Sequence, residues 1–138
     1  MDKLIYDEFC FLEKLYGLKY KFQTFDLQRG WIISAHSFYN DTGCFTIHNM
    51  ESRGELYFYY SKRFSKNRNK LYEKSINIYS VEKEIWDKYG RFGWIPNIFF
   101  WWNNKKILRV SAEVVKAHIN KYNKFCGITI VCDSKTTS

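Results

Sequence analysis

The chain has 138 residues, of which 46% are hydrophobic and 20% aromatic, a size and composition typical of one domain with a single core. Its 22 lysines and arginines exceed its 14 acidic residues, and the net charge of +8 favours an anionic partner such as nucleic acid, a membrane surface or an acidic protein face. The longest apolar run, Ile98–Trp102, is too short to span a membrane, and acidic residues in the first segment exclude a signal peptide, so we expect a cytoplasmic protein with no membrane partner.

The N-terminal segment has the pattern of an amphipathic helix. Apolar side chains recur at helical spacing over residues 3–16, and Gly17 is well suited to end a helix. We therefore predict a first helix whose apolar side, including Leu15, lies in the core.

The next segment has the pattern of four consecutive strands. Apolar and polar side chains alternate from Leu18 onward, and turn-forming residues at 40–43 and 52–54 separate the later runs. The predicted strands are 18–23, 31–38, 44–48 and 55–61. Because their links are short, they should form an antiparallel meander.

The C-terminal half contains fewer strands and one long helix. The predicted elements are a strand at 75–79, a short helix at 80–89, a long helix from about Lys105 to Lys124 and a closing strand at 128–132. The predicted fold is α+β, with an antiparallel sheet of about five strands and the N-terminal and long C-terminal helices packed on one face. Residues 1–133 form a single α+β domain in this interpretation, and residues 134–138 form a disordered tail.

The chain contains none of the motifs that mark nucleotide-binding, metalloprotease or hydrolase sites. A two-histidine ribonuclease site would need His36 and His48 on one side of the sheet. Counting outward from the turn at 40–43 pairs His36 with Ile47. The same count pairs His48 with Ala35, so the two imidazoles point to opposite faces. We therefore predict that the chain is not an enzyme and has no catalytic residue, cofactor or metal.

Two clusters combine basic and aromatic residues. The segment 62–70 has five basic residues in nine, with Phe64 among them. Such a segment can contact phosphate groups while its ring stacks on a base, or it can be a solvated loop. The second cluster joins the tryptophans at 101 and 102 to the lysines at 105 and 106. The four cysteines, at 10, 44, 126 and 132, form no C-x-x-C pair, and we expect them to be reduced and mostly buried.

The chain contains three segments rich in aromatic residues: Ser37–His48, Tyr57–Ser61 and Phe99–Trp102. In these segments, and in its small size and lack of catalytic motifs, the chain resembles the immunity proteins of contact-dependent growth inhibition and related bacterial polymorphic toxin systems. The resemblance implies a protein that binds one cognate toxin domain, often a nuclease, and blocks it. Such immunity proteins share no functional motif, so no residue role is transferred. Inhibitors of basic nucleases are commonly acidic, so this basic chain implies a toxin with an acidic patch or a mainly aromatic interface.

The strand at 55–61 supplies most of the candidate partner-binding residues. Its even-numbered side chains are the more apolar set and should face the helices, which leaves its tyrosines at 57 and 59 on the other side. There they are exposed, unless a loop or the second helix covers them. Two nearby arginines can pair with acidic groups of a toxin. The candidate residues are Arg53, Tyr57, Tyr59 and Arg63. We therefore expect an immunity protein that neutralises a toxin domain by direct contact, with a nucleic-acid-binding module as the alternative.

Overall fold

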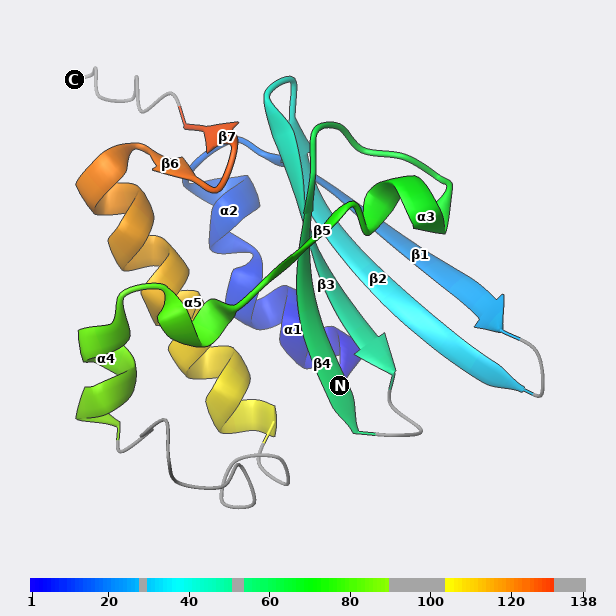
Figure 1. Ribbon diagram of the computed structural model, residues 1–138, viewed down its shortest axis with the longest axis horizontal. Coiled ribbons are helices and arrows are strands. Elements are labelled where there is room, and N and C mark those ends of the chain that lie inside the picture. The colour runs from blue at the N-terminus through cyan, green and yellow to red at the C-terminus, as the bar shows by residue number, and fades with distance from the viewer. Residues whose placement is uncertain (28–29, 51–53, 90–103, 131–138) are drawn as a thin grey trace.

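The computed structural model describes residues 1–27, 30–50, 54–89 and 104–130 (Figure 1). Five strands form one antiparallel sheet in the order β1-β2-β3-β4-β5, so each strand lies beside its neighbour in sequence. The N-terminal helices and the long C-terminal helix lie together on one face of this sheet (Figure 1). This arrangement confirms the predicted α+β meander. The predicted tail and the tryptophans at 101 and 102 lie outside the described ranges.

The strands alternate in side-chain direction and pair without a slip in register. They are β1 (Lys19–Leu27), β2 (Trp31–Asn40), β3 (Gly43–Met50), β4 (Glu55–Ser61) and β5 (Lys74–Ile76). The turn between β2 and β3 pairs Asn40 with Gly43, and Asn40 Oδ1 accepts a hydrogen bond from the Thr42 backbone N–H. Because this turn is tight, it determines the register of the two central strands.

Three helices lie on one face of the sheet: α1 (Asp2–Phe9), α2 (Phe11–Lys14) and α5 (Asn104–Tyr122). The helix predicted from Lys105 to Lys124 is therefore confirmed, with its end two residues earlier. Buried side chains recur along α5 every three or four positions, as an amphipathic helix requires, and they include Ile107, Leu108, Val115 and Ile119. With Phe9, Phe45 and Phe58 they form the main core between helices and sheet.

Shorter elements complete the fold. They are α3 (Arg68–Leu71), the 3-10 helix η2 (Ile78–Ser80), α4 (Lys83–Lys88), β6 (Lys124–Phe125) and β7 (Ile128–Thr129). The strand predicted at 75–79 thus ends at Ile76, where the chain turns into η2. The buried Trp86 indole N–H donates to the Ile78 carbonyl at 2.9 Å and ties η2 to α4.

Leu15 is not a core residue, contrary to the sequence prediction, because its side chain is 62% exposed. The predicted single helix is divided at Cys10, and α2 ends at Lys14, so the helical spacing does not extend to position 15. Gly17, with φ of +73°, then turns the chain toward β1. Leu18 is buried after this turn and occupies the core in place of Leu15.

The predicted closing strand at 128–132 does not join the main sheet. Its first two residues form β7, which pairs within the described part of the chain with β6 alone. Cys126, with φ of 55°, lies in the tight turn between the two strands. β6 and β7 therefore form a small hairpin that follows the C-terminal end of α5. The Thr129 N–H donates to Thr42 Oγ1 at 2.8 Å, which holds this hairpin against the turn between β2 and β3.

The opposite face of the sheet has a smaller cover. From α3, the fully buried Leu71 packs with Ala35 and Cys44 in a satellite core. On the same face, the hydroxyls of Ser37 and Thr46 share a buried hydrogen bond of 2.9 Å. This face therefore combines a few apolar contacts with buried polar groups, and the candidate site lies on it.

Candidate partner-binding surface

The two candidate tyrosines of β4 lie on the face that α3 covers, and they differ in exposure. Tyr57 is 46% exposed, as predicted. Tyr59 is only half-exposed to solvent because its ring stacks on Tyr72, with a centroid distance of 4.2 Å and an interplanar angle of 5°. The even-numbered side chains of β4 pack on the helix side, as predicted. The expectation of two freely exposed tyrosines was wrong for Tyr59, because Tyr72 at the end of α3 covers it.

A buried histidine lies at the centre of these rings. His48 is 5% exposed, and its Nδ1 lies 3.1 Å from the Tyr72 hydroxyl oxygen. Its ring meets those of Tyr57, Tyr59 and Tyr72 edge to face. The other nitrogen, Nε2, is buried and has no hydrogen-bond partner among the described residues. Burial, assisted by the positive charge of Arg68, lowers the pKa of His48 to about 4, so the imidazole is neutral at pH 7.

Basic side chains extend from this aromatic cluster along the segment that links β4 to α3. Four of them are exposed and form no ion pair with another described residue: Lys62, Arg63, Lys66 and Lys70. Lys62, Arg63 and Lys70 line a hollow of about 480 Å³, and Glu73 is the acidic residue in its described lining. Glu73 already accepts a hydrogen bond from the Lys62 backbone N–H. Arg53, the remaining candidate, lies outside the described residues.

Phe64 is packed, and the basic segment is not a solvated loop along its whole length. The Phe64 ring stacks on Tyr39 at a centroid distance of 4.6 Å, and both rings contact the satellite core under α3. Gln23 of β1 donates from Nε2 to the Ser65 carbonyl at 3.3 Å. The segment 62–70 therefore crosses the sheet with its aromatic side chain inward and its cations outward.

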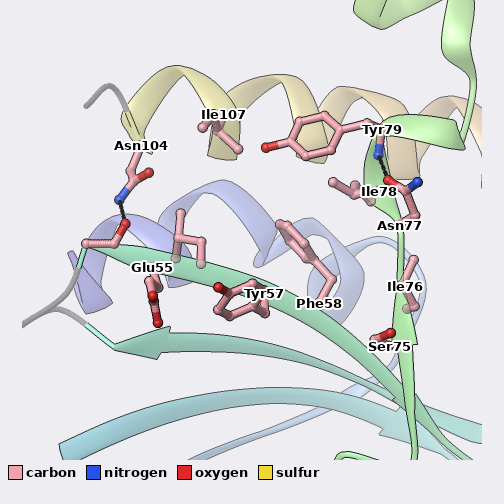
Figure 2. Close-up of a pocket in the computed structure, with 12 residues that line it drawn as sticks. Glu55, Tyr57, Phe58, Ser75, Ile76, Asn77, Ile78, Tyr79, Asn104 and Ile107 are labelled. Atoms are coloured by element: carbon pink, nitrogen blue, oxygen red, sulfur yellow. Dashed lines mark hydrogen bonds between the residues drawn. The ribbon is translucent and has the colours of Figure 1, made fainter. Parts of the chain in front are cut away.

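A second hollow, of about 420 Å³, lies at the edge of the sheet (Figure 2). Figure 2 shows β4 along one side of it, the start of α5 along the other, and β5 with η2 at one end. Asn104 Nδ2 donates to the Gly54 carbonyl at 3.2 Å, which links α5 to the start of β4. We call this hollow the edge groove. Tyr57 lines it too, so the edge groove adjoins the aromatic cluster.

His36 and His48 point to opposite faces of the sheet, as the sequence predicted. His36 pairs with Ile47, and His48 pairs with Ala35. The buried His36 has a partner on each nitrogen, since Nε2 lies 2.9 Å from Asp2 Oδ1 and Nδ1 lies 2.9 Å from the Tyr20 hydroxyl. This pair of histidines cannot act on one phosphate, because the sheet separates the two rings.

The third histidine also has a structural partner. His118 of α5 places Nδ1 3.0 Å from Glu82 Oε2, and Lys121 pairs with the other oxygen of the same carboxylate. The hydrogen bond from Lys121, together with the weaker one from His118, holds the pKa of Glu82 below its ordinary value. Lys121 also donates to Glu84 at 3.2 Å. The cluster therefore fastens α4's start to α5.

The described residues hold no group of three side chains that could bind a metal ion together. The described cysteines are all free, but only Cys44 is buried, whereas Cys10 is half-buried and Cys126 is exposed. The expectation of mostly buried cysteines was therefore wrong for Cys126, because it lies in an exposed turn. No helix in the described ranges is both long enough and apolar enough to cross a membrane.

Sequence reasoning missed the residues that complete the aromatic cluster. Tyr72 and Arg68 belong to α3 and its C-terminal end, and this four-residue helix is too short to show a helical period. One signal was available: Asn67 caps this helix by accepting a hydrogen bond from the Asn69 N–H. The cap could have indicated a short helix after β4. It could not have indicated that Tyr72, at the end of this helix, stacks on Tyr59.

Comparisons with protein families, with curated proteins and with solved structures gave no match to this chain. A function for this chain therefore has to be argued from the geometry and charge of its surface.

Proposed function

We propose that this chain is an immunity protein, which binds a bacterial toxin domain and neutralises it by direct contact. The binding surface in this proposal consists of β4, the segment 62–70 and α3. The observation that supports it best is the set of exposed cations that form no ion pair with another described residue, on the same face of the sheet as the exposed ring of Tyr57. Aromatic anchors next to arginine and lysine are typical of protein interfaces. The partner would present an acidic patch, which the net charge of +8 would attract.

A protein partner fits the surface better than single-stranded nucleic acid does. Binding of single strands relies on aromatic rings that are free to stack on bases. Here Phe64 stacks on Tyr39 and Tyr59 stacks on Tyr72, so each of these rings already uses one face. The cations alone still favour nucleic acid as the second candidate, because phosphate groups would pair with them without any base contact.

The test of the first candidate is binding to the toxin domain that is encoded directly beside this chain's gene. The variant combines Arg63→Ala, Lys66→Ala and Lys70→Ala. A matched control removes three exposed lysines elsewhere, in Lys14→Ala, Lys83→Ala and Lys124→Ala. We expect the first variant to lose about tenfold or more in affinity and the control to lose much less, because local pairing exceeds long-range attraction.

Two results would contradict the proposal. Equal losses in the two triple variants would mean that only net charge matters, and unchanged binding of the first variant would exclude this surface. Failure of the unaltered chain to bind any neighbouring toxin domain would exclude the function itself. The second candidate, nucleic-acid binding, is tested by titrating labelled single-stranded and duplex DNA at several salt concentrations. Sub-micromolar binding at physiological salt that is lost in the same triple variant would favour nucleic acid over a toxin domain as the partner.

A further inference from the structure

A hollow with a mainly basic lining lies where the chain leaves β4 and folds back through α3 toward β5 (Figure 1). Residues 62–65 line it from the first arm of this loop, and Asn69, Lys70 and Glu73 line it from the second arm. We call it the cationic hollow. Its volume of about 480 Å³ lies within the size range of pockets that bind small molecules.

Hydrogen bonds and packing hold the walls of the cationic hollow in place. The two arms are joined where Glu73 Oε1 accepts a hydrogen bond from the Lys62 backbone N–H at 3.0 Å. The Ser61 hydroxyl donates to the Arg63 carbonyl at 2.9 Å, and Phe64 packs against the satellite core. A ligand therefore meets a lining whose backbone is already ordered, which lowers the entropic cost of binding.

Three cations line the hollow against one carboxylate. Lys62, Arg63 and Lys70 are exposed and form no ion pair with another described residue. Together with the carboxylate of Glu73 they give the described lining a net charge of +2. A phosphate monoester carries about −1.5 to −2 charges at pH 7, whereas a carboxylate or a phosphodiester carries a single negative charge. The charge of the lining therefore matches a terminal phosphate better than either of the other two groups.

The rest of the lining suits the other parts of such a ligand. Asn69 adds a polar side chain, and Ser65 Oγ accepts a hydrogen bond from the Asn67 N–H and can donate its own proton to a phosphate oxygen. Phe64 adds an aromatic ring, which stacks on Tyr39 with one face. Because the hollow is larger than a phosphate ion and includes this ring, it has room for an organic group beside the phosphate.

We propose that the cationic hollow binds a small phosphate monoester whose phosphate carries a flat organic group, the chemistry of a nucleoside monophosphate. The phosphate lies among Lys62, Arg63 and Lys70, and the flat group packs against Phe64. This site goes beyond the proposed immunity function and does not depend on it. Because Arg63 and Lys70 also belong to the surface assigned to the toxin domain, the ligand and the toxin domain would compete.

Matched small molecules test the site in the full chain. Adenosine monophosphate is the probe, its phosphate methyl ester is the control with a single negative charge, and adenosine is the control without phosphate. We expect backbone amide signals of 62–65 and 69–73 to shift with the probe, at a Kd on the order of millimolar or tighter. The methyl ester should bind at least about fivefold more weakly, because it has lost one of the charges that pair with the lining. Adenosine should bind more weakly still.

Two lysines of the same loop locate the site. Lys70 lines the hollow and Lys66 does not, although both are exposed. Lys70→Ala should weaken binding of adenosine monophosphate at least about fivefold, whereas Lys66→Ala should weaken it less than about twofold, because salt screens a cation outside the hollow. Glu73→Gln keeps an oxygen that can accept the Lys62 N–H and removes the negative charge, so it should strengthen binding.

Three results would overturn the proposal. Equal binding of the monoester and its methyl ester would mean that the hollow takes a phosphodiester, as the nucleic-acid alternative requires. Equal losses in Lys66→Ala and Lys70→Ala would mean that net charge alone attracts the probe. The absence of any shift in 62–65 and 69–73 would mean that the hollow takes no phosphate.

Failure of this proposal is distinct from failure of the proposed function. If adenosine monophosphate binds the hollow while no neighbouring toxin domain binds the chain, the phosphate site stands and the immunity function does not. If a toxin domain binds the cationic surface while adenosine monophosphate leaves 62–65 and 69–73 unshifted, the immunity function stands and the phosphate site does not.

Discussion

The two faces of the sheet are covered in different ways. On one face, α1 and α5 enclose a continuous apolar core, and the buried His36 has partners on both ring nitrogens. On the other face, the four residues of α3 cover a satellite core, and the buried His48 has one nitrogen without a partner among the described residues. Exposed cations that form no ion pair with any other residue in the described ranges gather on this second face. Each side holds one buried polar atom without a hydrogen-bond partner among the described residues, Ser111 Oγ in α5 and His48 Nε2 on the second face. The exposed cations are therefore what makes the second face suited to a partner.

The largest expected difference between the faces concerns their apolar side chains. Ile119 of α5 and Leu71 of α3 are both fully buried. Ile119→Ala should lower the free energy of unfolding by about 2–5 kcal/mol, because the main core cannot collapse around the cavity. Leu71→Ala should cost less, near the lower end of that range, since its small cluster can relax. Chemical denaturation of both variants checks this, and equal costs would remove the distinction between the faces.

The next effect is the response of stability to pH. The pKa of His48 is about 4 in the folded chain and near 6.5 when unfolded. The unfolded chain therefore binds a proton that the folded chain does not, between pH 6.5 and pH 4. The free energy of unfolding should have its full value above pH 6.5 and fall by up to about 3 kcal/mol as the pH falls to 4.

The pH effect can be assigned to one residue by substitution. His48→Phe keeps a ring in the same space and cannot take up a proton, so its stability should fall less between pH 6.5 and pH 4 than that of the unaltered chain. Burial also lowers the pKa of His36, although its contacts with Asp2 oppose that change, so a smaller slope should remain. An unchanged slope in His48→Phe would show that His48 is not the source.

On the helix-covered face, the polar contacts of Asp2 should contribute a smaller amount. Asp2 accepts hydrogen bonds from Ser34 and Asn49 and pairs with His36. Asp2→Ala leaves His36 Nε2 buried without this partner and should cost about 1–3 kcal/mol. Asp2→Asn, which keeps a hydrogen-bonding group, is the control and should cost less. Equal melting temperatures for the two variants and the unaltered chain would contradict the role of Asp2 in fixing α1 to the sheet.

The smallest expected effect lies outside both cores. Leu15→Ala should change the free energy of unfolding by no more than about 0.5 kcal/mol, because Leu15 is exposed. Leu12→Ala is the matched control, since Leu12 is buried one turn earlier and should cost about 2 kcal/mol or more. Thermal unfolding of the two variants measures this difference. A large loss of stability in Leu15→Ala would show that Leu15 belongs to the core.

The sequence predicted the parts of the fold that depend on local patterns. The turn at 40–43 determines the register of β2 and β3, and the apolar spacing of α5 identifies that helix. Leu15 was misplaced because helical spacing alone does not show where a helix ends. The point at which α2 stops depends on how Gly17 turns the chain toward β1.

The site was less predictable because it depends on contacts between distant segments. Alternation along β4 correctly placed Tyr57 and Tyr59 on one face. The ring that covers Tyr59 comes from Tyr72, and nothing in the pattern of residues 68–72 shows that they fold back over β4. The edge groove results from the early end of β5, which likewise depends on tertiary contacts made by η2.

Hydrogen exchange of the complex with the toxin domain is the most direct test of the difference between the two faces. We predict that toxin binding slows exchange of backbone amides in β4, in the segment 62–70 and in α3, while exchange in α5 stays unchanged. Slower exchange confined to α4 and α5, with none in β4 or α3, would contradict the assignment of the partner to the second face.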